Sequence, residues 1–140
     1  MILDQISVFV ENKPGALSDV TAQLSEAGID FKAFTVADTA EFGILRFIVD
    51  APKKALTLLK LNGWVASLTP VVAVKMNDEP GSLARILKLL SDNSVQVEYM
   101  YAFVAQEEGR AYVVFRVADP AAAAALLEAS GFATSASIVR

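Results

Sequence analysis

Two short segments of this chain combine polar side chains with a Pro-Gly pair in a pattern that could bind a small anion. Residues 12–17 read Asn-Lys-Pro-Gly-Ala-Leu, and residues 78–83 read Asp-Glu-Pro-Gly-Ser-Leu. At a strand-to-helix turn, proline suits the first helical positions, and glycine lets a ligand approach the backbone closely. The N–H groups at a helix start attract a carboxylate. A tight turn without a ligand explains the same residues, so both interpretations stay open.

The remaining residue types exclude several kinds of chemistry. The chain has no histidine and no cysteine. A Ser-His-Asp triad, a cysteine nucleophile, a disulfide and a thiolate metal site are therefore excluded. No GxGxxG or phosphate-loop pattern occurs, and no acidic pair stands out. Nothing in the sequence indicates catalysis, a metal or a cofactor.

Composition and charge limit the classes of molecule that the protein could bind. The 140 residues are 54% hydrophobic with a formal net charge of -4. An acidic chain without a basic block is a poor match for nucleic acid or an anionic membrane surface. The first ten residues carry Asp4 and no basic segment, which is untypical of a signal peptide. We therefore expect a cytoplasmic protein.

The Pro-Gly phrase belongs to a longer internal repeat. Pro14 and Pro80 are 66 residues apart, as are Gly15 and Gly81, Leu17 and Leu83, and Leu24 and Leu90. The offset then becomes 68 for Phe47 and Phe115, Pro52 and Pro120, and Gly63 and Gly131. An ordered series with one small shift indicates two copies of one unit.

Each copy predicts the same order of elements. Apolar strand-like segments at 5–10 and 71–76 precede helical spacing that begins with Leu17 and Leu83. Gly28 and Asn93 are suited to end these helices in a left-handed conformation. Two strands, a helix beginning with proline and a last strand follow, the last strands at 64–69 and 132–139. The order βαββαβ, twice, predicts an α+β protein of two ferredoxin-like units side by side, with antiparallel sheets and helices on one face.

The sequence also predicts where the two units meet. The expected domains are residues 1–69 and 70–140. Pro70 cannot donate a hydrogen bond to a β-ladder, so we expect it to mark a break or an edge.

The repeat resembles the ACT domain. The segments that carry the resemblance are VENKPGALSDVTAQLSEAGIDFKAF in the first copy and, less closely, MNDEPGSLARILKLLSDNSVQVEYM in the second. The resemblance covers nearly the whole chain as a tandem of two ACT-like units. It implies a small regulatory protein that binds an amino acid or a similar carboxylate at a domain interface.

The resemblance also implies site residues. In the first copy these are Asn12, Lys13, Pro14, Gly15, Ala16, Leu17 and Asp30. The matching, weaker candidates in the second copy are Asp78, Pro80, Gly81, Ser82, Leu83 and Gln96. Because Asp78 and Glu79 add negative charge beside the second helix start, we expect the first turn to bind the ligand.

One face of the sheets is more apolar than a solvated face should be. The side chains expected there are Phe9, Phe34, Ile44, Ile48, Tyr112 and Val114. A second chain that covers them is the simplest explanation, so we expect a homodimer.

Three functions stay open. The first is an amino-acid-binding regulator that acts on a partner enzyme. The second is an interaction or oligomerisation module that has lost ligand binding. The third, an enzyme or an RNA-binding module on the same fold, lacks the arginine or the basic aromatic strand that it would need.

Overall fold

The computed structural model describes residues 1–38, 41–104 and 108–132. In chain order the elements are β1 (Ile2–Glu11), α1 (Ala16–Glu26), β2 (Phe31–Asp38), β3 (Phe42–Val49), α2 (Pro52–Leu61), β4 (Val65–Asn77), α3 (Ser82–Asp92), β5 (Tyr99–Val104), β6 (Arg110–Arg116) and α4 (Pro120–Ala129). Six strands and four helices confirm the predicted α+β class. The predicted last strand, 132–139, lies outside the described residues apart from Phe132.

The described residues form two compact units. The first unit contains residues 4–69, and the second contains residues 70–132 together with Met1–Leu3. Strand β4 contributes to both units, since it runs from Val65 through Pro70 to Asn77. The expected break in the strand at Pro70 is therefore wrong. We keep residues 1–69 and 70–140 as the proposed domains.

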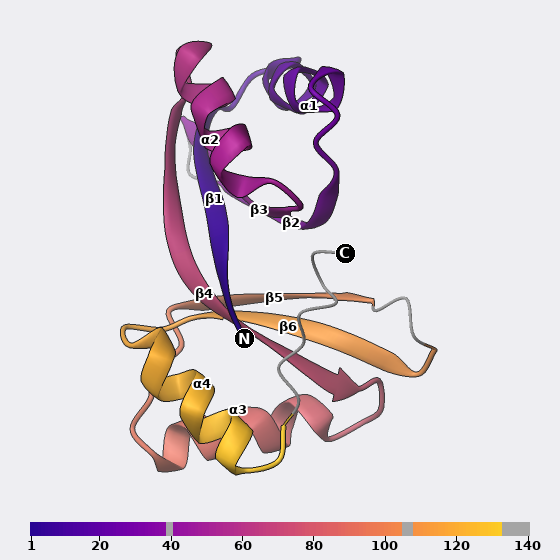
Figure 1. Ribbon diagram of the computed structural model, residues 1–140, viewed down its shortest axis with the longest axis vertical. Helices are drawn as coiled ribbons and strands as arrows, with labels where there is room; N and C mark the ends of the chain where they lie inside the picture. The colour runs from indigo at the N-terminus through magenta and orange to yellow at the C-terminus, as the bar shows by residue number, and fades with distance from the viewer. Residues whose placement is uncertain (39–40, 105–107, 133–140) are drawn as a thin grey trace. The chain divides into compact units, whose positions relative to one another are not determined.

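Each unit has a sheet covered by helices on one face. In the first unit the strand order is β2-β3-β1-β4, and α1 and α2 lie on one face of the sheet (Figure 1). In the second unit β6 lies between β4 and β5, and α3 and α4 cover one face. None of the described helices is both long and apolar enough to cross a membrane.

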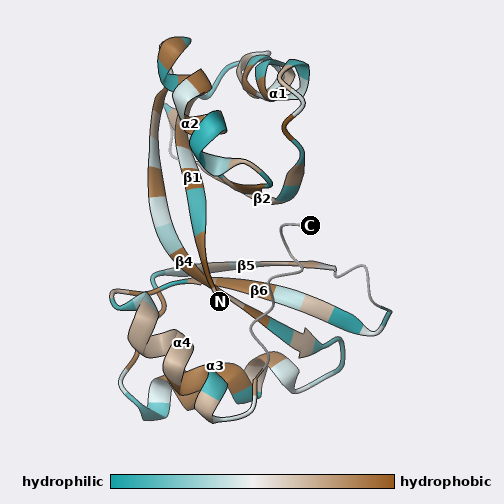
Figure 2. Ribbon diagram, viewed as in Figure 1, coloured by the Kyte–Doolittle hydropathy of each residue, from teal (hydrophilic) through white to brown (hydrophobic). Residues whose placement is uncertain are grey.

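The two cores are built from equivalent strand pairs. In the first unit Ile6 lies opposite Phe47 and Val8 lies opposite Leu45. In the second unit the matching pairs are Val72 with Phe115 and Val74 with Val113. All eight side chains are buried against their helices. Figure 2 shows hydrophobic and hydrophilic residues interspersed in the first half of β4, which is followed by a hydrophobic stretch that includes the four consecutive buried residues Val71–Val74.

Both Pro-Gly turns have the same backbone. Gly15 has φ 89° and Gly81 has φ 92°, in the left-handed region that favours glycine. The Asn12 N–H donates to the Glu41 carbonyl at 3.1 Å, and the Asp78 N–H donates to the Gly109 carbonyl at 2.8 Å. Each turn is therefore tied to the start of the third strand of its own unit.

The buried stripe of each first helix begins one residue earlier than the sequence suggests. Ala16, Val20 and Leu24 are buried in α1, whereas Leu17 is 43% exposed. In α3 the buried positions are Ser82, Ile86 and Leu90. The left-handed turn rotates the helix so that the small residue after glycine meets the sheet.

The predicted apolar face is largely covered within the chain. Ile48, Tyr112 and Val114 are buried, at 1%, 5% and 0% exposure, so they need no second chain. Phe34 lies opposite the core residue Phe47 in the β2–β3 ladder and so belongs to the helix side of the sheet. Of the six predicted side chains, only Phe9 and the half-buried Ile44 lie on the sheet face away from the helices and remain at least partly exposed.

Candidate functional site

The turn before α1 borders a pocket of about 380 Å³ in the first unit. The end of β1, the start of α1, the start of β3 and the turn after α2 each supply part of its lining. The side chains that carry its chemistry are Phe9, Glu11, Lys13, Asp19, Phe42 and Trp64. The pocket therefore combines charges of both signs with three aromatic rings.

The charged groups of this pocket are accessible. Lys13 Nζ lies 3.0 Å from a Glu11 carboxylate oxygen, and both side chains are exposed. An exposed ion pair contributes less than about 1 kcal/mol, so a ligand can readily exchange with it. Gly15 offers no side chain to cap α1, and a Cβ at this glycine would meet nothing within 4 Å. The start of the helix is thus open to an anionic group.

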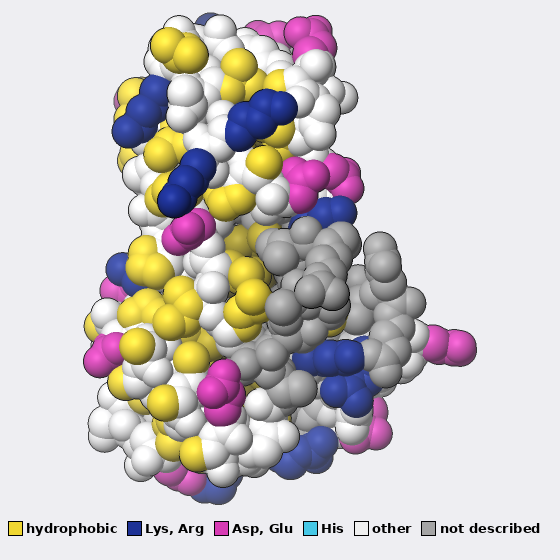
Figure 3. Space-filling model, viewed as in Figure 1, with side chains coloured by type: hydrophobic (Ala, Val, Ile, Leu, Met, Phe, Trp, Pro, Cys, Tyr) yellow, Lys and Arg dark blue, Asp and Glu magenta, His cyan; other side chains and the backbone are white. Residues whose placement is uncertain are grey.

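Trp64 is held in place at the wall of the pocket. Its indole Nε1–H donates to Gln23 Oε1 on α1 at 2.8 Å. The hydrogen bond fixes the ring between the turn after α2 and the first helix. Figure 3 shows hydrophobic side chains between scattered charged ones on one face of the unit that carries α1 and α2.

The structure brings together only some of the predicted first-copy residues. Lys13 and Ala16 line the pocket, whereas Asn12, Pro14, Gly15 and Leu17 form or border the turn without lining it. Asp30 lines a different hollow of about 510 Å³, beside Phe31 and Phe34. Its carboxylate accepts a hydrogen bond from Lys32 Nζ at 2.9 Å.

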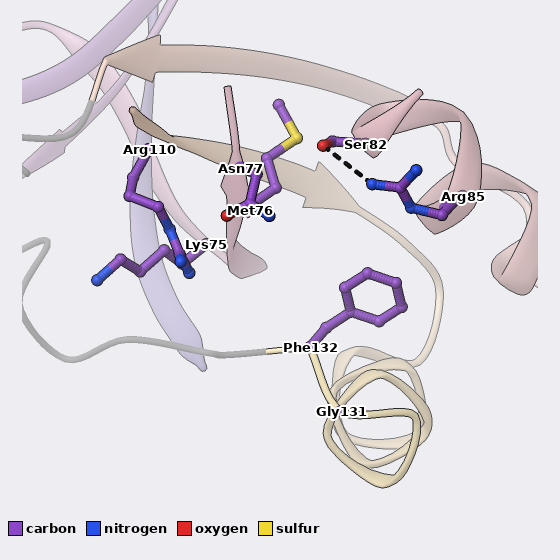
Figure 4. Close-up of a pocket in the computed structure, with 8 residues that line it drawn as sticks. All are labelled: Lys75, Met76, Asn77, Ser82, Arg85, Arg110, Gly131 and Phe132. Atoms are coloured by element: carbon purple, nitrogen blue, oxygen red, sulfur yellow. Dashed lines mark hydrogen bonds between the residues drawn. The ribbon is translucent and has the colours of Figure 1, made fainter. Parts of the chain in front are cut away.

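The second unit has a pocket at the equivalent place. Its volume is about 290 Å³, and its polar and aromatic lining comes from Lys75, Asn77, Ser82, Arg85, Arg110 and Phe132 (Figure 4). Of the predicted second-copy residues, only Ser82 lines it. Asp78, Pro80, Gly81 and Leu83 belong to the neighbouring turn and helix start, and Gln96 lines a separate hollow of about 250 Å³.

The charge of this second pocket differs from expectation. Glu79 forms an ion pair with Arg85 at 3.5 Å, and neither Glu79 nor Asp78 is among the lining residues. Within the described lining, the charged groups are three cations. Arg110 Nε is buried and has no hydrogen-bond partner in the described part of the chain. A buried donor without a partner costs about 1–3 kcal/mol, which makes this atom an unusual feature.

The family model of the ACT domain pair matches residues 1–133. The chain belongs to the ACT domain pair family. Its two units, each with a Pro-Gly turn between a first strand and a first helix, are the two ACT domains. No curated protein matches the sequence.

Solved structures support the same fold for this ACT domain pair. Protein BT0572 from Bacteroides thetaiotaomicron is 35% identical, with a TM-score of 0.91 over 100% of this chain and 97% of that one. The regulatory subunit of aspartate kinase from Thermus thermophilus, in a ligand-free form, is 20% identical, with a TM-score of 0.68 over 91% and 92%. The corresponding subunit from Thermus flavus is 18% identical, with a TM-score of 0.61 over 93% and 95%.

Sequence reasoning missed the residues that distinguish the two pockets. Asp19, Phe42 and Trp64 of the first pocket, and Arg85 and Arg110 of the second, lie outside the Pro-Gly turns. The repeat itself contained a usable signal. At the offset of 66, Asp19 aligns with Arg85, which reverses the charge at a matched position. The match of Phe42 with Arg110 comes from the β-ladders, where they lie opposite Glu11 and Asn77.

Proposed function

We propose that this ACT domain pair is a regulatory protein without catalytic activity that binds an α-amino acid in the first pocket. The observation that carries the proposal is the lining of that pocket, with both charge signs and aromatic walls beside an uncapped helix start. A volume of about 380 Å³ falls in the usual range for small-molecule sites.

The two charged groups of an amino acid have matching partners in this pocket. Lys13 and the N-terminal turn of α1 attract the ligand carboxylate. Glu11 and Asp19 supply acceptors for the ligand ammonium group. Phe9, Phe42 and Trp64 leave an apolar wall for the ligand side chain. We therefore expect a preference for an apolar or aromatic amino acid.

A thermal-shift screen with the twenty amino acids tests the proposal. A ligand that binds only the native state increases the free energy of unfolding, by about 2.7 kcal/mol when its free concentration is a hundred times Kd. The melting temperature therefore rises. We expect one or a few apolar amino acids to produce the shift. If none of the twenty does, and calorimetry also detects no binding, the ligand-binding function is wrong.

Substitutions locate the site. Asp19→Asn and Lys13→Gln should each weaken binding of the best amino acid about tenfold, because each removes a charge-assisted hydrogen bond. Glu26→Gln is the matched control for Asp19→Asn, since it removes an exposed carboxylate from the same helix outside the pocket. If Glu26→Gln weakened binding equally, the loss of affinity would result from the change in net charge and not from the pocket. Asn12 and Asp30 stay predictions, and Asn12→Ala tests the first of them.

The proposal includes a partner enzyme and a cytoplasmic location. The role of two similar structures as regulatory subunits suggests the partner enzyme. Fractionation of cells and co-purification with the tagged chain would test both statements.

A second candidate function is an interaction module without a ligand. It is favoured by exposed apolar side chains such as Phe34 and Leu61, at 67% and 80% exposure, and predicts no thermal shift with any amino acid.

A further inference from the structure

The two equivalent pockets differ in charge, since the first has two carboxylates and one cation in its lining and the second has three cations. The β-ladders fix the equivalence, because Glu11 lies opposite Phe42 in the first unit and Asn77 lies opposite Arg110 in the second. The first pocket has Phe9, Glu11, Asp19 and Phe42 where the second has Lys75, Asn77, Arg85 and Arg110. Two carboxylates are lost and three cations are gained at matched positions.

Arg110 presents the strongest single sign of a ligand. Its Nε is buried without a hydrogen-bond partner in the residues that the structure describes. A buried guanidinium N–H is rarely left in this state, because it loses its water without gaining an acceptor. An anionic oxygen in the pocket would supply that acceptor.

The other side of the pocket is formed by α3. Arg85 Nη2 donates to Ser82 Oγ at 3.3 Å and lies 3.5 Å from the Glu79 carboxylate. Because this ion pair is exposed, it holds Arg85 only weakly. Figure 4 shows Arg85 and Ser82 on one side of the pocket and Arg110 with Lys75 on the other. The ring of Phe132 lines the pocket on the same side as Arg85 and adds an apolar surface.

We propose that the second pocket binds a small organic dianion, and that it does so independently of the amino-acid site in the first unit. Cations on two sides favour a ligand with two negative charges, and the apolar surface of Phe132 favours a carbon skeleton between or beside them. Dicarboxylates and phosphate esters share this chemistry. The chain would then sense two different ligands through two copies of one turn.

Calorimetry at low ionic strength tests the proposal on the full chain. The probes are succinate and inorganic phosphate as dianions, and succinamide as the neutral isostere of succinate. We expect at least one dianion to bind, succinamide not to bind, and affinity to fall as salt increases. Binding of succinate alone identifies a dicarboxylate site, and binding of phosphate alone identifies a phosphate site. Absence of binding by both dianions overturns the proposal.

Charge-removing variants identify the pocket. Arg110→Gln and Arg85→Gln should each weaken the bound dianion about tenfold or more, because each removes a charge-assisted hydrogen bond. Lys88→Gln is the matched control, since Lys88 is an exposed cation of α3 outside the pocket. Arg85 is itself exposed, so its variant tests the site even where Arg110→Gln lowers stability. Equal weakening by Lys88→Gln, or none by Arg85→Gln, overturns the proposal.

The two binding functions can be separated in the same variants. Arg110→Gln and Arg85→Gln should leave the affinity for an amino acid in the first pocket unchanged. Asp19→Asn should leave the affinity for the dianion unchanged. A loss of both ligands in one variant would show that the pockets are not independent.

Discussion

Gly15 and Gly81 have nearly the same left-handed backbone, yet their surroundings differ. A Cβ at Gly15 would meet nothing within 4 Å, whereas a Cβ at Gly81 would lie 3.3 Å from Arg85 Nη1. A β-branched side chain strains either turn, because φ near 90° is disfavoured for residues other than glycine. The backbone strain is therefore shared, whereas a side chain at position 81 would also meet the flexible end of Arg85.

We predict that Gly15→Val abolishes amino-acid binding and that Gly81→Val affects it less. Both variants should lose about 1–3 kcal/mol of stability, since both place a branched residue in a strained conformation. Chemical denaturation measures that loss, and calorimetry below the unfolding transition measures binding. Loss only with Gly81→Val would show that the amino acid binds in the second unit, and equal binding in both variants would contradict the choice of the first turn.

Trp64 allows binding in the first pocket to be distinguished by fluorescence from binding in the second. It is the single tryptophan of the chain, it lines the first pocket, and the matched residue of the second pocket is Phe132. We predict that the bound amino acid changes the tryptophan fluorescence spectrum and that the bound dianion does not. Gln23→Ala should shift the emission of the free protein, because it removes the acceptor of the indole N–H. A spectral change with the dianion alone would contradict the assignment.

At the scale of elements, the first helices of the two units end with the same hydrogen bonds but different residues. After α1, Gly28 has φ 74° and its N–H donates to Ser25; after α3, Ser94 has φ 60° and its N–H donates to Ser91. The sequence places the left-handed residue at Asn93, but Asn93 has φ -105°. The second unit thus holds a serine where the backbone favours glycine.

We predict that Ser94→Gly stabilises the protein and that Gly28→Ser destabilises it. The left-handed conformation costs a residue other than glycine about 1–2 kcal/mol, part of which is offset by the greater chain entropy of unfolded glycine. A net gain of about 0.5–1 kcal/mol should raise the melting temperature by roughly 1–4 °C. Scanning calorimetry of the two variants measures the shifts. A lower melting temperature for Ser94→Gly would show that the serine has an unrecognised contact.

At the scale of the whole molecule, the exposed apolar surface is different from the surface that the sequence suggests. Three of the six predicted side chains are buried within the chain, and Phe34 lies on the helix side of the sheet. Phe9, at 51% exposure, remains on the predicted outer face of β1, opposite the half-buried Ile44. A smaller patch is left to attract a second copy.

We predict a homodimer that buries Phe9. Light scattering at micromolar concentration should report twice the chain mass, and Phe9→Ser should weaken the dimer at least about tenfold, because interface aromatics carry much of the binding energy. Leu61→Ser is the control, since Leu61 is exposed on α2. A monomer at all concentrations, or equal effects of the two substitutions, would contradict the prediction. Ile48→Asp is no test of the interface, because Ile48 is a buried residue of the chain.

The sequence by itself determined the repeat, the order of elements and the conformation of the Pro-Gly turns. These features depend on local chemistry, namely hydrophobic periodicity and the freedom of glycine to adopt positive φ. The same local chemistry indicated an anion site at each helix start, with the first turn favoured by the charges next to it in sequence.

Only the tertiary structure decided which side chains meet around each turn. Phe42 and Arg110 reach the pockets through the pairing of a third strand with a first strand, and Trp64 and Phe132 reach them through the turn after the second helix. The sequence neighbours Asp78 and Glu79 do not line the second pocket, and Glu79 pairs with Arg85, so the charges next to the turn in sequence differ from those that line the pocket. The charged side chains of one pocket come from segments that are distant in the sequence, and strand pairing and packing bring those segments together.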